Sequence, residues 1–159
     1  MLEILEMSAA EIRDALRDLR FGHLGCSRDD QPYVVPIYFA YDSDEIFIYT
    51  NAGYKSELID ANPLVCLQAE DILPNGQWRS VIANGRAERI EVPTERERAI
   101  ELIRESNPRL LPATALRWRN DWIRKPVEIV YRIRITSMSG LCSSEVGIMT
   151  AGVRPTFST

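Results

Sequence analysis

The sequence contains few of the residue types from which many active sites are built. It has one histidine, His23, and two lysines, Lys55 and Lys125, although it has 17 arginines. A zinc site built on several histidines is therefore excluded for one copy of the chain, and we expect no metal. A Ser-His-Asp triad would depend on His23 alone. This scarcity favours chemistry supplied by a bound cofactor.

Disulfide frameworks and membrane spans are also unexpected. The three cysteines, Cys26, Cys66 and Cys142, lie far apart and form no C-x-x-C pair, so buried free thiols are the better interpretation. No apolar run approaches the length of a membrane-spanning helix, and the first 20 residues are acidic and amphipathic. We therefore expect a cytoplasmic protein that does not enter a membrane.

The chain has the length and composition of a single globular domain. It has 159 residues, of which 45% are hydrophobic and 26% charged, and its 19 basic and 23 acidic side chains give a net charge of −4. This balance argues against bulk binding of nucleic acid.

One segment, 117–134, departs from this balance. It holds six basic and two acidic residues, a local charge of +4 that leaves −8 for the rest. It also carries Trp118 and Trp122, which share one face if the segment is helical. It could form a dimer seam, the wall of a site, or a solvated basic face over buried tryptophans. If it is exposed, an RNA-binding barrel becomes a further alternative.

Periodicity and turn signals predict a mainly β protein of α+β type. A capping box at Ser8 and Glu11 opens a helix over 8–20, a short helix follows Lys55, and a second capping box at Thr94 and Glu97 opens a third. Six strands are expected in hairpin-linked order, and a nearly closed antiparallel barrel would hide their edges. We expect the domain to cover 1–142, and 143–159 to be a mobile or partner-bound tail. The expected strands are 21–26, 32–41, 46–50, 64–70, 78–90 and 127–135.

A proline interrupts the second expected strand. Pro36 has no amide to donate, so it should mark a bulge or an unpaired stretch. The run Val35-Pro36-Ile37 could then offer backbone groups to a planar heterocycle. An edge-strand proline without further role explains the same residues.

The segment from Thr50 to Lys55 is the most informative one. A hydroxyl and a carboxamide at a strand end, Thr50 and Asn51, are followed by Gly53 and by a lysine on the first turn of a helix. Amides at a helix start and a full positive charge suit an anion such as a phosphate monoester. A surface turn with a solvated lysine is the alternative.

Two further polar residues lie on expected strands. Ser80 has no nucleophile-elbow context, so it is a hydrogen-bond donor candidate and not a hydrolase serine. His23 has apolar neighbours and fits a structural wall residue better than a ligand or base.

The order of these segments resembles the pyridoxamine 5′-phosphate oxidase-related, FMN-binding split-barrel superfamily, in particular its nitroimidazole-resistance-like branch. The resemblance is carried by FGHLGCSRDDQPYVVPIYFAYDSDEIFIYTNAGYKSELIDANPLVCLQAED and by WRSVIANGRAERI, which together cover nearly half of the chain. It implies a six-stranded Greek-key split barrel that forms a homodimer, with FMN between the two subunits.

The resemblance also implies roles for individual residues. Val35, Pro36 and Ile37 would line the isoalloxazine through backbone contacts, and Thr50, Asn51 and Lys55 would hold the ribityl phosphate. Ser80 would assist, and Trp118 or Trp122 would close the site from the partner subunit. The implied activity is that of a flavin oxidoreductase acting on a small-molecule substrate.

Two departures limit this comparison. The oxidase holds its substrate with a late Arg-x-His pair, but no histidine follows His23 here. The nitroimidazole-resistance branch has a histidine where this chain has Tyr49-Thr50-Asn51. A non-catalytic dimer that carries haem or a deazaflavin, or no flavin, is the alternative, and haem would use His23 as its axial ligand.

Overall fold

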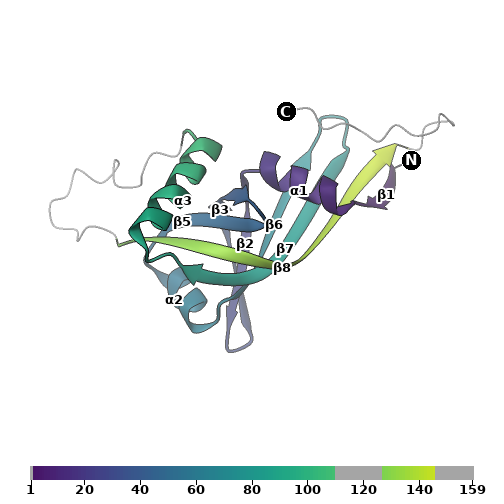
Figure 1. The fold of residues 1–159 in the computed structure, drawn as a ribbon. Helices are drawn as coiled ribbons and strands as arrows, with labels where there is room; N and C mark the ends of the chain where they lie inside the picture. Colours follow the sequence, from purple (N-terminus) through teal and green to yellow (C-terminus); the bar gives the residue numbers. More distant parts are fainter. Residues whose placement is uncertain (1, 110–126, 146–159) are drawn as a thin grey trace, which may run out of the picture.

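The computed structural model describes residues 2–109 and 127–145, and Figure 1 shows a strongly curved sheet with helices packed around it. The described residues form eight strands and three helices. In chain order these are β1 (Leu2–Glu6), α1 (Ala9–Asp18), β2 (Phe21–Arg28), β3 (Gln31–Tyr38), β4 (Ala40–Asp42), β5 (Glu45–Asn51), α2 (Tyr54–Ala61), β6 (Leu64–Ile72), β7 (Trp78–Arg89), α3 (Pro93–Ser106) and β8 (Glu128–Glu145).

All strand pairs are antiparallel, and the sheet is open. Its order is β3-β2-β6-β7-β8-β5-β4, with β1 paired to β8 outside this path. The expected fold class, mainly β with about three helices, is confirmed. The strand count is eight where six were expected, because β1 was read as part of an amphipathic segment and β4 as part of the strand before it.

The last described strand, β8, pairs with three other strands of the sheet. One edge of β8 pairs with β7, and its other edge pairs with β5 over 128–134 and with β1 over 141–145. The register between β7 and β8 shifts between Asn84 and Gly85, where β8 carries one extra residue, Thr136, in a bulge. The strand continues to Glu145, inside the segment expected as a tail, while residues 146–159 lie outside the described part.

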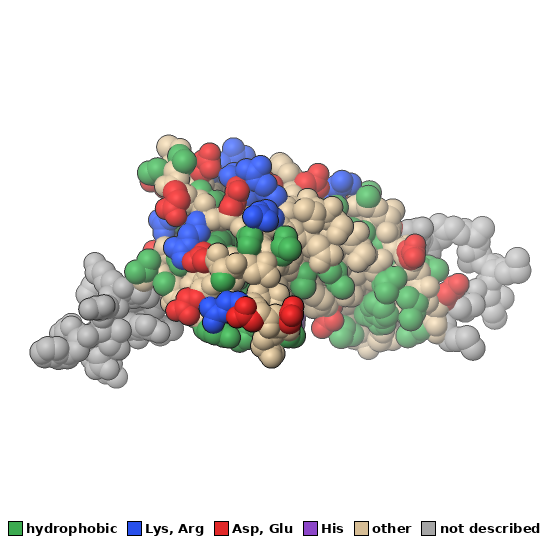
Figure 2. Space-filling view, turned by 90° about the horizontal axis from the view of Figure 1, so that it is seen from below, with side chains coloured by type: hydrophobic (Ala, Val, Ile, Leu, Met, Phe, Trp, Pro, Cys, Tyr) green, Lys and Arg blue, Asp and Glu red, His purple; other side chains and the backbone are tan. Residues whose placement is uncertain are grey.

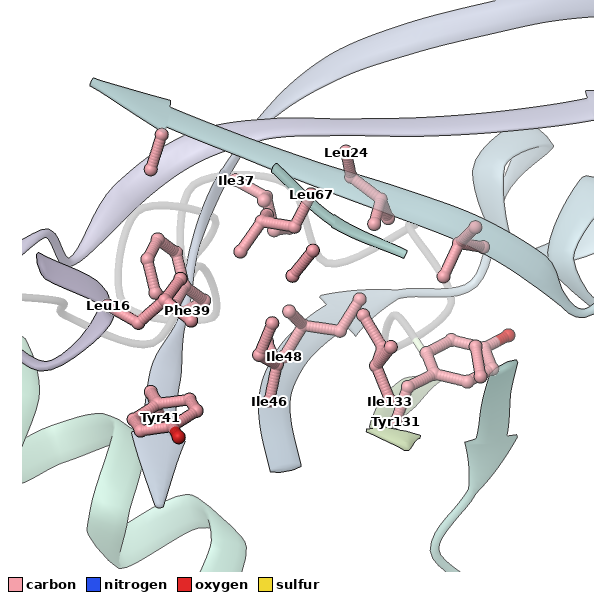
Figure 3. Close-up of a cluster of buried hydrophobic side chains, with 14 of the residues drawn as sticks. Leu16, Leu24, Ile37, Phe39, Tyr41, Ile46, Ile48, Leu67, Tyr131 and Ile133 are labelled. Carbon is pink, nitrogen blue, oxygen red and sulfur yellow. The ribbon is translucent and has the colours of Figure 1, made fainter. Parts of the chain in front are cut away.

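Two apolar clusters hold the sheet together. The larger one fills its concave side, where Leu24, Ile37 and Leu67 face Ile46, Ile48 and Ile133 (Figure 3). The smaller one lies under α3 and includes Phe47, Ile103 and Val130. Because β4, β5 and β8 contribute to both clusters, this part of the sheet is covered on its two faces.

Helix starts were predicted with unequal success. The capping box at Ser8 and Glu11 is present, and both of its hydrogen bonds form. The one expected at Thr94 and Glu97 is wrong, since α3 begins at Pro93 with Val92 as its N-cap and no side-chain cap. Proline at the first helical position already fixes the backbone there.

Tight turns set the register of both early hairpins. Asp29 and Asp30 join β2 to β3, and Ser43 and Asp44 join β4 to β5; all four have φ between 51° and 61°. Two consecutive residues with positive φ are typical of the hairpin turn whose twist matches the strands.

All three cysteines lie in the described ranges and none of them forms a disulfide there, and Cys26 and Cys142 are buried. None of the helices described, α1 to α3, is long and apolar enough to cross a membrane.

Candidate functional site

A strand that changes partner creates an opening in the sheet. β3 pairs with β2 along its whole length, and after Phe39 the chain continues as β4, which pairs with β5 instead. The sheet therefore ends at β3 on one side and at β4 on the other. We call the region where β3 and the second half of β5 diverge the split.

The backbone of β3 presents polar groups to the split. The amide of Phe39 donates to the carbonyl of Arg20 at 3.0 Å, which fixes the alternation of the antiparallel ladder. The peptide groups of Val35 and Ile37 are directed to β2, and those of Val34, Pro36 and Tyr38 to the free edge. The register is continuous through Pro36, so no bulge forms there and the proline occupies an unpaired edge.

The end of β5 presents polar groups in the same way. The amide of Ala52 donates to the carbonyl of Val127 at 2.7 Å, so the peptide group of Thr50 is directed to β8. Those of Tyr49 and Asn51 are directed away from β8, beyond the last pair that β4 makes, Ala40 with Phe47. The side chains of Thr50 and Asn51 are half-buried, and the Thr50 hydroxyl donates weakly to the Asn51 carbonyl at 3.4 Å.

The start of α2 lies across the wide end of the split. The ring of Tyr54, the first residue of α2, meets the ring of Tyr33 on β3 at right angles, with 5.0 Å between centroids. This contact ties the helix to β3, and the amine of the next residue, Lys55, lies near Cys26 on β2. Of the expected site residues, Thr50, Asn51 and Lys55 lie on one segment from the end of β5 to the first turn of α2. Val35, Pro36 and Ile37 lie on β3, but the peptide groups of Val35 and Ile37 are directed to β2, so of these three only Pro36 directs its carbonyl to the edge.

Lys55 is a half-buried cation. Burial lowers the pKa of its amine below the usual 10.5, and the nearby Cys26 acts weakly in the opposite direction. Burial also raises the pKa of the Cys26 thiol, which favours its neutral form. Among the described residues, no carboxylate forms a salt bridge with Lys55.

The first turn of α2 is arranged by a serine. The Gly53 amide donates to the Ser56 hydroxyl at 2.9 Å, and that hydroxyl donates to the Gly53 carbonyl at 2.8 Å. The first intrahelical bond runs from the Glu57 amide to the Gly53 carbonyl, so the amides of Tyr54 to Ser56 precede it. The helix start can therefore offer backbone donors beside the Lys55 amine.

Ser80 lies elsewhere in the chain's own fold. It is half-buried on the outer face of β7, and β6 and β2 separate that strand from β3. Gln68 connects it to the histidine: Gln68 Nε2 donates to Ser80 Oγ at 3.1 Å, and His23 Nδ1 lies 3.3 Å from Gln68 Oε1. Within one chain the structure therefore does not bring Ser80 beside Lys55.

The outer face of the sheet carries exposed apolar side chains around the hydrogen-bonded residues His23, Gln68 and Ser80. Seven large hydrophobic side chains on β2, β3, β6, β7 and β8 are at least 41% exposed. A group of exposed apolar side chains on one face of a folded chain is typical of a binding surface. The seven are Phe21, Val34, Tyr38, Leu64, Ile72, Ile82 and Leu141.

Only part of the basic segment 117–134 can be compared with its prediction. Trp118, Trp122 and the other residues up to 126 lie outside the described part. Arg132 and Arg134 both pair with Glu88, at 2.6 Å and 3.0 Å. On the face shown in Figure 2, basic and acidic side chains are interspersed, so neither sign dominates it.

A hollow of about 570 Å³ lies along α3, but it shares no residue with the split. Glu97, Glu101, Arg104 and Glu105 line it together with Ile100 and Pro108. In the described ranges, no three His, Cys, Asp or Glu side chains come together as a metal site.

Sequence reasoning missed Tyr33 and Tyr54. Their proximity is a tertiary contact between β3 and α2, which no local pattern in the sequence signals.

Comparison with protein families gives a match over most of the chain. Residues 8–141 match the family model described as pyridoxamine 5′-phosphate oxidase. A curated relative, an uncharacterized protein from Rhizobium meliloti (strain 1021), is 36% identical over 80 residues. That alignment covers 50% of this chain and 53% of the relative, so the chain spans about half the length of the curated relative.

Solved structures show the same architecture. An FAD-binding protein from Mesorhizobium loti is 30% identical, with a TM-score of 0.73 over 91% of this chain and 100% of the other. A candidate 5-nitroimidazole antibiotic resistance protein from Bacteroides thetaiotaomicron is 18% identical, with a TM-score of 0.69 over 90% of this chain and 89% of its own. The latter similarity concerns the fold alone.

Proposed function

Because the chain belongs to the pyridoxamine 5′-phosphate oxidase family, we propose that it binds flavin mononucleotide, alone or as the corresponding half of FAD, at the split. We propose further that it acts as an oxidoreductase on a small-molecule substrate. The relative of 30% identity is described as an FAD-binding protein, which supports a flavin ligand.

Lys55 is the observation that carries this proposal. A half-buried ammonium group without a carboxylate partner among the described residues is suited to a bound anion. The helix-start amides and the Thr50 hydroxyl lie in the same short segment and add donors. Because these groups are all donors, the segment fits a phosphate and would repel a cation.

The edge of β3 fits the other end of the ligand. A flavin ring carries alternating donors and acceptors along one side, and an unpaired strand edge presents the same alternation. Val34 contributes an amide and a carbonyl there, and Pro36 contributes only a carbonyl. Val35 packs against the core, so the strand that carries these groups is held rigidly.

A homodimer would complete the site. The apolar outer face from β3 to β8 is suited to a second copy of the chain, since a two-fold contact buries the same patch on both subunits. Through such a contact, Ser80 of one subunit could reach a ligand bound at the split of the other subunit. Within one chain, β2 and β6 separate Ser80 on β7 from β3.

A bound flavin would supply the electron transfer. The chain's own residues bind and orient it: Lys55 neutralises the phosphate, and the β3 edge sets the position of the ring. This division of roles fits a chain with a single histidine, since no side chain needs to act as a redox group.

The absorption spectrum of the purified protein tests the proposal. We expect flavin bands that dithionite bleaches, and a released cofactor with the mass of FMN or FAD. Lys55→Gln should weaken flavin binding about 10-fold or more, because a charge-assisted contact contributes roughly 1.5–3 kcal/mol. Arg17→Gln removes an exposed cation from α1, a helix that contributes no group to the split, and is the control that should bind normally.

Other spectra would contradict the proposal. A Soret band would indicate haem, and a released deazaflavin would identify a different redox carrier. A protein that neither retains nor takes up flavin would also be inconsistent with it.

A further inference from the structure

An exposed aromatic ring lies next to the proposed phosphate position. Tyr54 directly precedes Lys55, and 51% of its surface is exposed. It is a large apolar side chain at the first position of a helix, where capping and packing require no aromatic residue. The Tyr33 ring contacts it at right angles and so fixes its position.

We propose that Tyr54 is a stacking platform for the adenine of FAD, and therefore that the site takes the dinucleotide in preference to FMN. This inference rests on the proposed flavin function. About half of the Tyr54 surface is accessible to a base, and the Tyr33 ring contacts the Tyr54 ring at right angles. Stacking of a base on an aromatic ring is a common and sequence-tolerant mode of nucleotide binding.

The Tyr54 ring and the Lys55 amine lie over neighbouring positions of the sheet, because Tyr54 contacts Tyr33 on β3 and Lys55 lies near Cys26, the residue of β2 that pairs with Tyr33. The adenine and the phosphates of one ligand would therefore reach both groups. Lys55 is a single cation, and the phosphates of a dinucleotide each carry one negative charge. A terminal phosphate monoester concentrates about two charges at one place, which one half-buried lysine balances less well.

The Tyr33–Tyr54 contact also has a purely structural interpretation, in which it only anchors α2. The two interpretations differ in what they predict for FMN. If the ring acts only as an anchor, its loss displaces Lys55 and weakens both flavins equally. If it binds adenine, its loss weakens FAD alone.

Equilibrium titration of the flavin-free protein with FMN and with FAD decides between them. We expect the unmodified protein to prefer FAD about tenfold or more, in line with the contribution of one stacked base. Tyr54→Ala should lose this preference and keep its affinity for FMN, while Tyr54→Phe should retain the preference. Leu2→Ala removes a similarly exposed apolar side chain, 45% exposed, from β1, which pairs with the opposite end of β8 from β5, and should change neither affinity.

The failures of the two proposals are distinguishable. If both flavins bind and Tyr54→Ala binds FAD as well as the unmodified protein does, the adenine platform is wrong and the flavin site stands. An equal loss of FMN and FAD affinity in Tyr54→Ala also overturns the platform. If neither flavin binds to the unmodified protein, the proposed function itself fails.

Discussion

Arg89 at the end of β7 holds Asp60 of α2 through two hydrogen bonds. Its Nε donates to Asp60 Oδ1 at 3.0 Å, and its Nη2 donates to Oδ2. The hydroxyl of Tyr131 on β8 also donates to Asp60 Oδ1, at 3.1 Å. Lys55, the proposed phosphate ligand, lies in the first turn of α2, and Asp60 lies in its last turn. The Arg89–Asp60 pair therefore anchors the opposite end of the helix that carries Lys55.

Asp60→Asn should lower the free energy of unfolding by about 1 kcal/mol at neutral pH, after allowance for solvent screening of a partly exposed pair. The Arg89 hydrogen bond holds the pKa of Asp60 below its usual 3.8. A carboxylate with a lowered pKa stabilises the fold above its unfolded pKa and loses this effect as the pH falls through the folded value.

Urea denaturation of both proteins across the acid range measures this difference. The two curves should differ at pH 7 and converge as the pH falls below 3.8. Asp14→Asn, in an exposed pair with Arg17 on α1, is the matched control and should stay within about 0.5 kcal/mol of the unmodified protein. Equal stability of Asp60→Asn at every pH would show that the pair does not hold α2.

Flavin affinity should fall at high pH because of Lys55. Burial lowers the pKa of the amine, so its charge is lost at a pH below the usual 10.5. Binding that depends on the charged form is complete below this pKa and is lost as the pH rises through it. Lys55→Arg keeps its charge throughout and should show the smaller decline, as followed by flavin fluorescence. Parallel declines in the two proteins would remove Lys55 from the phosphate site.

Gly85→Ala should destabilise the fold by about 2–4 kcal/mol. A Cβ at this bulge would lie 2.5 Å from the backbone oxygen of Arg134 and 2.7 Å from Ile133 Cγ2, so strands must move apart. Gly53→Ala is the matched control, since nothing lies within 4 Å of its Cβ. Thermal unfolding compares the two variants, and a similar melting temperature for both would contradict the assigned register.

Ile82→Glu should shift the protein from dimer to monomer if the apolar outer face is the subunit contact. Ile82 is 41% exposed at the centre of that face, and a buried unpaired charge opposes association. Val92→Glu changes an exposed residue beside α3 and should leave the assembly unchanged. Light scattering after gel filtration gives the masses, and a dimer that persists in Ile82→Glu would place the contact elsewhere.

Local signals in the sequence predicted most elements correctly. Alternating apolar residues, two-residue turns and the capping box at Ser8 are properties of neighbouring residues, and these predictions are confirmed. β1 was missed because its partner is the far end of β8, where Leu2 pairs with Glu145. The end of β8 was missed for a related reason, since Ser143 pairs with Ile4 on β1 and accepts a hydrogen bond from the amide of Trp78 on β7, both far away in the sequence.

The same difference between local sequence signals and long-range contacts explains which parts of the site could be predicted. Thr50, Asn51 and Lys55 form one continuous segment, so their proximity needed no tertiary information. The line from His23 through Gln68 to Ser80 depends on the register between three strands. Which peptide groups of β3 face β2 and which face the edge depends on the pairing of the two strands. The hydrogen bond from the Phe39 amide to the Arg20 carbonyl determines it, and the sequence alone does not.

The central place of β8 bears on how this protein folds as it is synthesised. Without residues 128–145 the remaining strands fall into separate groups: β3-β2-β6-β7, the β4-β5 hairpin and the isolated β1. Nearly all of the described chain must therefore leave the ribosome before these groups can join. Until then, the edges of β7 and β5 that pair with β8 stay unpaired. Such late, long-range closure predicts slow folding and a nascent chain that depends on protection from aggregation.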